Sequence, residues 1–134
     1  EVKARTVLEN DLAWAFPSFY PIAPVHLLVC PKRCVKTYDE LTVEEREAMI
    51  DLISRLKPAL VRAYEAVGFN YAWNEGPAAG QTVPHVHVHF VPRRANDKQE
   101  LGFDPKDHFY VADIQHPLSD EELQCLKTEI QSYL

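Results

Sequence analysis

One segment, residues 83–91, constrains this chain more than any other, because histidine alternates there with hydrophobic residues. From His85 onward the sequence reads His-Val-His-Val-His-Phe-Val. Successive side chains of a β-strand point to opposite faces, so this period predicts a strand with histidines on one face and apolar residues on the other. Burial of three unpaired imidazoles would cost several kcal/mol, and we therefore expect the histidine face to line a polar cleft.

Three histidines on one face suit more than one function. An exposed polar face is the simplest interpretation, but the repeated spacing disfavours chance. A shared metal ion is limited by geometry, because His85 and His89 would lie about 13 Å apart in a strand, against a zinc–nitrogen bond of about 2.1 Å. The third interpretation is attack on phosphorus by a neutral imidazole. His87 would then be the nucleophile, since it has an imidazole on each side, and a flanking histidine would protonate the leaving group.

A glycine-bearing loop comes just before the histidine segment. Residues 76–82 read Gly-Pro-Ala-Ala-Gly-Gln-Thr, which offers backbone amides and a hydroxyl close to the histidine face. Preformed donors of this kind suit an anionic phosphate group. A plain connection between two strands explains the glycine content equally well.

The remaining sequence predicts an α+β domain. Thr42 and Glu45 have capping-box spacing at the start of a long amphipathic helix, which we expect Pro58 to kink or split and Gly68 to end. A second capping box predicts a final helix from Ser119. Strands are predicted in a hairpin over residues 4–16 and over residues 25–29, 69–73 and 83–91. This order of elements favours antiparallel pairing over a doubly wound parallel sheet.

Composition narrows the function classes further. The chain has 134 residues, 46% of them hydrophobic, which suits one globular domain with its own core. A net charge of −6 argues against nucleic acid as a partner, because that partner requires a concentrated basic face. Three sparse cysteines favour a reducing compartment over a disulfide scaffold. No apolar run approaches the roughly 20 residues of a membrane span, so we expect a cytoplasmic protein with no membrane partner.

Three segments of the chain together resemble the histidine triad (HIT) family. Residues 85–91 are similar to its signature of alternating histidine and hydrophobic residues, and residues 24–31 and 74–83 resemble its two other recognisable stretches, in the same order. The resemblance covers roughly residues 1–95. It implies an antiparallel sheet of about five strands packed with one long helix and a C-terminal helix. Residues 1–134 would then be a single HIT domain with a C-terminal extension, whose helix covers about 119–133.

The resemblance implies a nucleotide hydrolase or transferase that is usually a homodimer with joined sheets. His87 would attack the α-phosphorus and form a nucleotidyl-histidine that water hydrolyses, and His89 would contact the α-phosphate and the leaving group. His85 and His26 would orient these groups. An adenine nucleotide is the expected ligand. By resemblance, its phosphate would lie beside Asn74, Gly80, Gln81 and Thr82, and its base and ribose beside Phe16, Ser18 and Phe19.

The branch of the family stays open at this point. Residues 76–83 and 29–31 resemble the Fhit branch, which cleaves dinucleoside polyphosphates, whereas residues 74–76 are closer to the Hint branch, which cleaves nucleoside phosphoramidates. We expect no protein-bound metal and no required cofactor, although magnesium could enter with the nucleotide. A nucleotide-binding protein without turnover is the alternative function, and a histidine metalloprotein is a weaker one. His108 and His116 match no part of the family pattern, and we expect both at the surface.

Overall fold

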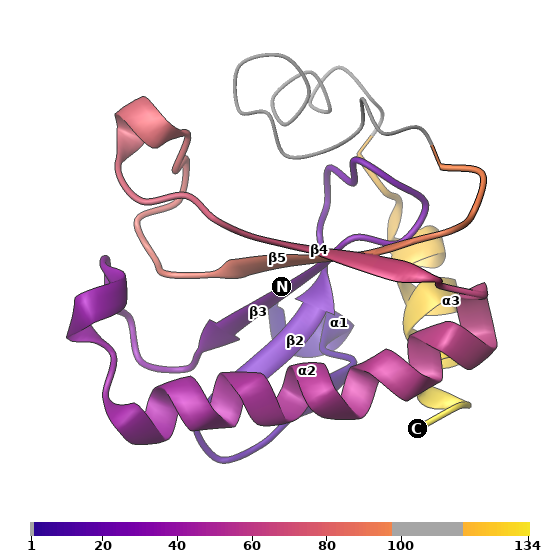
Figure 1. The fold of residues 1–134 in the computed structure, drawn as a ribbon, viewed down its shortest axis with the longest axis horizontal. Helices are drawn as coiled ribbons and strands as arrows, with labels where there is room; N and C mark the ends of the chain where they lie inside the picture. Colours follow the sequence, from indigo (N-terminus) through magenta and orange to yellow (C-terminus); the bar gives the residue numbers. More distant parts are fainter. Residues whose placement is uncertain (1, 98–116) are drawn as a thin grey trace.

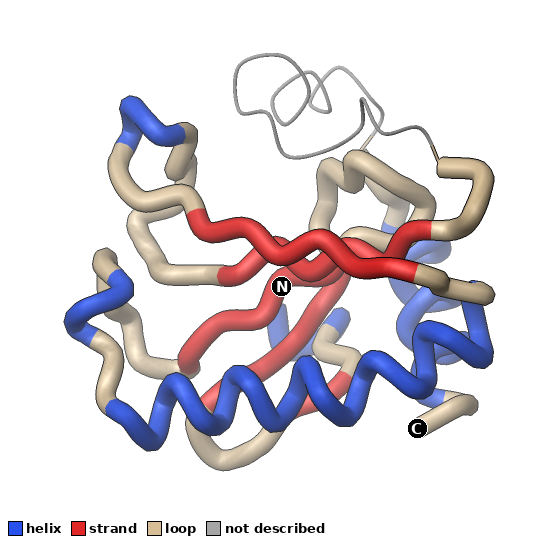
Figure 2. The backbone as a smooth tube through the Cα atoms, viewed as in Figure 1, coloured by secondary structure: helices blue, strands red, loops and turns tan. Residues whose placement is uncertain are grey.

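A five-stranded antiparallel sheet with a long helix across one face organises the chain (Figure 1). The structure, a computed structural model, describes residues 2–97 and 117–134. The strand order is β1-β2-β3-β5-β4, which confirms the predicted α+β class (Figure 2). In chain order the elements are α1 (Val2–Arg5), β1 (Leu8–Glu9), β2 (Ala13–Pro17), β3 (Leu27–Pro31), the short 3-10 helix η1 (Tyr38–Glu40), α2 (Val43–Tyr64), β4 (Gly68–Trp73), the 3-10 helix η2 (Pro77–Ala79), β5 (Val88–Arg93) and α3 (Asp120–Gln131).

The helix α2 begins where the capping box predicts. The Thr42 side chain accepts a hydrogen bond from the Glu45 amide at 3.0 Å, and the Glu45 carboxylate accepts one from the Thr42 amide at 2.9 Å. Arg33 also donates two hydrogen bonds to this buried carboxylate. Arg33 and these hydrogen bonds hold the pKa of Glu45 down to about 2. The start of the helix is therefore fixed by an ionised acid.

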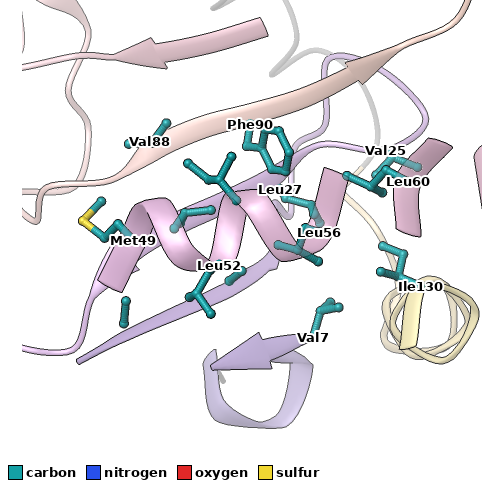
Figure 3. Packing of buried hydrophobic residues seen from close by; sticks show 14 of the residues in the cluster. Val7, Val25, Leu27, Met49, Leu52, Leu56, Leu60, Val88, Phe90 and Ile130 are labelled. Carbon is teal, nitrogen blue, oxygen red and sulfur yellow. The ribbon is translucent and has the colours of Figure 1, made fainter. Parts of the chain in front are cut away.

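One apolar stripe of α2 forms the core with the sheet. Leu52, Leu56 and Leu60 are fully buried and pack against Leu27 and Phe90 of the central strands (Figure 3). Their spacing of four residues places them on one helix face. Along β5, Val88 and Phe90 point to this helix, so His89 between them points to the opposite face of the sheet.

The end of α2 differs from the prediction. The helix is continuous through Pro58, so it is not split there, and the alternative of a kink stays a prediction. Pro58 and Ser54, the residue whose carbonyl loses its partner, are both exposed to water. It ends at Tyr64, and Glu65 takes the left-handed conformation with φ 60°. Gly68 does not end the helix, since it already pairs with Arg93 as the first residue of β4.

Other strand boundaries also shift. The predicted hairpin forms between β1 and β2, but residues 2–5 are helical, and the strand expected over 25–29 occupies Leu27–Pro31. The strand expected over 83–91 begins only at Val88. Pro84 has no amide hydrogen to donate, and the Val86 amide donates instead to the Val35 carbonyl at 2.8 Å.

The helix α3 begins at Ser119 as its capping box predicts. Its Ile130 is 1% exposed and joins the core formed by α2 (Figure 3). Lys127 donates to the Ala4 carbonyl and Gln131 to the Val7 carbonyl, which ties α3 to the first residues of the chain. His108 and His116 lie outside the described residues.

Replacement of Leu56 by alanine should destabilise the protein by about 2–5 kcal/mol, because it leaves a cavity between α2 and the sheet. Urea unfolding followed by circular dichroism measures this loss. Val61→Ala on the same helix is the matched control, since Val61 is 46% exposed and should change stability by no more than about 0.5 kcal/mol. Equal losses in both variants would contradict the assigned core.

Candidate active site

A cavity of about 700 Å³ opens on the face of the sheet that α2 does not cover. It brings together nine of the residues that the sequence marks as candidates: His26, His85, His87, His89, Phe16, Ser18, Phe19, Gly80 and Thr82. The alternating pattern therefore predicts the shared histidine face correctly, although two of its histidines precede the strand.

The strand register forms the floor of this cavity. Phe16 of β2 lies opposite Leu28 of β3, and Leu28 lies opposite His89 of β5. Directly opposite residues point to the same face of a sheet, so these three side chains form one row from the middle of the sheet to β2. The row is apolar at Phe16 and Leu28 and ends at the imidazole of His89.

Two buried histidines are joined by a hydrogen bond. The amide of Ile22 donates to Nδ1 of His26 at 3.1 Å, so that nitrogen carries no proton. Nε2 of His26 must then carry the hydrogen, and it donates to Nδ1 of His89, 2.9 Å away. In neutral His89 the hydrogen is consequently on Nε2. One backbone amide thus fixes the tautomers of two rings.

Burial keeps these two rings neutral. Desolvation, with the nearby charge of His87, lowers the pKa of His26 to about 3. Desolvation, with His26 and His87 adding to it, lowers the pKa of His89 to about 2. Both values lie below the ordinary 6.5, so the unfolded chain binds protons first and stability falls as the pH drops below about 6.5.

His87 is held in the opposite tautomer. Its Nδ1 lies 2.7 Å from the carbonyl oxygen of His85, which can only accept, so Nδ1 carries the hydrogen. The lone pair is then on Nε2. Desolvation lowers the pKa of His87, which the bond to the His85 carbonyl partly opposes. The ring packs edge-on to His89 with centroids 4.8 Å apart. A neutral nucleophilic nitrogen therefore lies next to a hydrogen-bond donor.

His85 positions this arrangement. Its Nε2 donates to the carbonyl oxygen of Pro31 at 2.9 Å, which ties the segment before β5 to the end of β3. The same residue supplies the carbonyl that orients His87. The ring of His85 thus makes one of these bonds and its backbone carbonyl the other, while its supporting role in the reaction stays a prediction.

The loop before the histidines closes on itself. The side chain of Gln81 accepts from the Gly76 amide at 2.8 Å and donates to the Lys36 carbonyl at 3.4 Å. Gly76 and Gly80 have φ of 88° and 98°, a region that favours glycine. Gly80 and Thr82 line the cavity. Gln81 does not, because its amide is engaged in shaping the loop.

Asn74 also lies outside the cavity lining. Its Nδ2 is buried and has no hydrogen-bond partner in the structure. The contact of Asn74 with phosphate stays a prediction.

The sequence analysis missed part of the apolar end. The alternation of β2 and β3 could have indicated Trp14, Leu28 and Cys30, which follow the same period as Phe16 and His26. Burial raises the pKa of the Cys30 thiol to about 12, so it is a neutral wall of the cavity. No sequence signal indicated the others: Val2, Arg5, Tyr20, Ile22 and Val83.

Neither a group of metal-ligating side chains nor a membrane-spanning helix is found among the residues that the structure describes. Among residues 2–97 and 117–134, no three His, Cys, Asp or Glu side chains are grouped so that they could hold a metal ion. No helix within these ranges is long and apolar enough to cross a membrane.

Comparison with known proteins shows which family the chain belongs to. The HIT domain model matches residues 1–96. The chain is 36% identical over 103 residues to a bifunctional bis(5'-adenosyl)-triphosphatase/adenylylsulfatase of Arabidopsis thaliana, a match that covers 77% of this chain and 54% of that protein. It is 32% identical over 124 residues to the bis(5'-adenosyl)-triphosphatase of Dictyostelium discoideum, covering 91% of this chain and 80% of that protein.

A solved structure agrees with these sequence relatives. The NitFhit protein of C. elegans superposes with a TM-score of 0.78 at 25% identity, covering 96% of this chain and 27% of that one. The chain spans about half the length of the Arabidopsis relative. It belongs to the HIT domain family. Within that family it is a Fhit-like protein, which decides between the two branches that the sequence left open.

The tautomers of the site can be tested by long-range proton–nitrogen NMR correlation. We expect His87 protonated on Nδ1 and His26 on Nε2, because backbone groups fix both rings. At pH 5 the rings of His26 and His89 should remain neutral, given pKa values of about 3 and about 2. The His87→Asn variant assigns the His87 signals. A proton on Nε2 of His87, or titration of either buried ring near pH 6.5, would contradict the geometry.

Proposed function

We propose that this chain is a hydrolase that cleaves dinucleoside polyphosphates at the α-phosphate through a covalent nucleotidyl-histidine on His87. The observation that carries the proposal is the 2.7 Å hydrogen bond from Nδ1 of His87 to the His85 carbonyl, which leaves the Nε2 lone pair toward the cavity. The names of the relatives, which are bis(5'-adenosyl)-triphosphatases, support the same reaction.

The reaction has two steps. Nε2 of His87 attacks the α-phosphorus, the bond from phosphorus to the bridging oxygen breaks, and a nucleoside phosphate leaves with the electron pair. Water then attacks the nucleotidyl-histidine, the phosphorus–nitrogen bond breaks, and a nucleoside monophosphate leaves. The electron pair returns to Nε2 and the water proton passes to solvent. Splitting the reaction in this way is the usual benefit of covalent catalysis.

The state of His89 favours an anionic leaving group. A pKa of about 2 means that the ring is neutral, so its Nε2–H can donate a hydrogen bond but has no extra proton to transfer. A phosphate leaving group has a second pKa near 6 and can depart as an anion. An amine leaving group, with a pKa near 10, needs a proton. The site therefore suits a dinucleoside polyphosphate better than a nucleoside phosphoramidate.

The cavity also offers contacts for the ribose and the base of the nucleotide. The Ser18 hydroxyl accepts from the Tyr20 amide at 3.2 Å, so its own O–H is directed to a second acceptor such as a ribose hydroxyl. Beyond it, Phe16 and Phe19 offer apolar ring surface to a base, beside the Arg5 guanidinium that lies over both rings. We propose an adenine nucleotide as the substrate, bound with any magnesium ion that its phosphates carry, and a cytoplasmic location consistent with three unpaired cysteines.

Replacement of His87 by asparagine should lower turnover of bis(5'-adenosyl) triphosphate by about 10³-fold or more, because asparagine cannot form the covalent intermediate. Release of AMP, followed by chromatography, measures it, and a phosphoramidate and a nucleotide sugar complete the substrate panel. Asp51→Asn, on the exposed face of α2, is the control and should keep full activity. Retained turnover in His87→Asn would overturn the mechanism. Nucleotide binding without turnover by the unaltered protein would favour a binding function.

We also propose that two copies join through β4, which is an edge strand of the sheet. Tyr71 and Trp73 on this strand are 47% and 42% exposed. An exposed edge with large apolar side chains invites pairing with another strand. Light scattering should therefore give about twice the chain mass, and Tyr71→Lys should shift the population to monomers. Leu12→Lys, an exposed apolar residue away from β4, is the control. A monomeric unaltered protein would contradict the proposal.

A further inference from the structure

Arg5 is a cation held inside an otherwise apolar part of the cavity. Its guanidinium carbon lies 3.9 Å from the ring centroid of Phe19 and 4.8 Å from that of Phe16. Its Nη1 donates to the Pro17 carbonyl at 2.9 Å. Burial lowers the pKa of Arg5, although an arginine still carries its charge at neutral pH. The side chain is therefore fixed by two ring faces and one hydrogen bond.

The remaining donors of Arg5 are not used by the described protein. Nε is buried without a hydrogen-bond partner. Nη2 has no hydrogen bond in the structure and is not buried. A guanidinium has five N–H donors and no acceptor, so it can pair only with acceptor atoms. The cavity wall thus offers unsatisfied donors to whatever occupies this end.

The strand register indicates which part of a bound nucleotide would lie at the Arg5 end of the cavity. His89, Leu28 and Phe16 lie in one row across β5, β3 and β2. Neighbouring strands are about 4.8 Å apart, so Phe16 lies about 10 Å from the strand of the catalytic histidines. Arg5 covers the Phe16 ring at this far end. With the α-phosphorus at His87 and the ribose beside Ser18, the group that reaches Arg5 is the base.

We propose that Arg5 is a specificity-determining residue that donates a hydrogen bond from Nη2 to the base and thereby extends the accepted bases to 6-oxopurines. This inference rests on the proposed function. Guanine and hypoxanthine carry an acceptor oxygen at position 6 beside the acceptor N7, and arginine pairs well with that edge. Adenine shares the acceptor N7, but its amino group at position 6 is a donor that faces the guanidinium unfavourably, so the gain from Arg5 is smaller for adenine than for a 6-oxopurine.

The position of Arg5 is maintained by the C-terminal helix. Lys127 of α3 donates to the carbonyl of Ala4, the residue before Arg5, at 2.9 Å. Leu118, which precedes α3, donates its amide to the Phe19 carbonyl at 2.9 Å. Both the arginine and the ring beneath it are thus held in place before a ligand binds, which reduces the entropy lost on binding.

Calorimetric binding of nucleoside monophosphates tests the inference. AMP, GMP and IMP share the ribose and phosphate, so their ratios of affinity isolate the base. In Arg5→Met the affinities for GMP and IMP should fall about 5- to 100-fold relative to the unaltered protein, and that for AMP less than about threefold. Lys3→Met removes the same charge from an exposed position on the same short helix and should change none of them. Arg5→Lys should keep part of the GMP affinity, because it retains a donor.

Each other outcome overturns the inference. Equal losses for all three nucleotides in Arg5→Met would mean that Arg5 only shapes the cavity or attracts the phosphate. Unchanged affinities would mean that it does not contact the base. Circular dichroism and thermal unfolding of each variant verify that the fold is retained. Because binding is measured, the result is separate from the proposed reaction: the expected ratios without any turnover would refute the hydrolase and leave the base-reading role intact.

Discussion

The hydrogen bond between Nε2 of His26 and Nδ1 of His89 is the interaction on which the site depends. It crosses from the loop before β3 to β5 and lies where both rings are buried. A buried imidazole without a partner would be costly, so the pair is tolerated only because the Ile22 amide completes the chain of donors and acceptors. The outcome is a preformed donor next to the Nε2 lone pair of His87, with the tautomers of all three rings fixed by backbone groups.

One face of the sheet packs against α2 and forms the core, and the other face lines the cavity. Val88 and Phe90 point to α2 and belong to the core, whereas His87 and His89 point to the cavity. The register of three strands then sets the length of the cavity floor, from the imidazole of His89 to Phe16. A shift of one residue along β5 would exchange these faces, so the packing of α2 also protects the alignment of the site.

Much of this arrangement could be predicted from the sequence. The parts that could not be predicted depend on contacts between residues far apart in the chain. The capping boxes at Thr42 and Ser119 use contacts three residues apart, and both helices begin where expected. The boundary at Val88 depends on the Val86 amide reaching Val35, a contact between distant parts of the chain. Arg5 could not be predicted for the same reason, because it is held by Phe16, Phe19 and the Pro17 carbonyl, which lie more than ten residues along the chain. A single sequence shows local periods but not which distant backbone groups will be satisfied.

The bond from Lys127 to Ala4 joins the two ends of the described chain beside Arg5, at the apolar end of the cavity. The family match ends at residue 96, so α3 lies outside the segment that defines the chemistry. Arg5, Phe16 and Phe19 lie within the matched segment together with the histidines, but Lys127 and Leu118, which bond to Ala4 and Phe19, lie outside it. Loss of the Lys127 bond would loosen the first residues of the chain and leave the hydrogen bonds of His26, His87 and His89 unchanged.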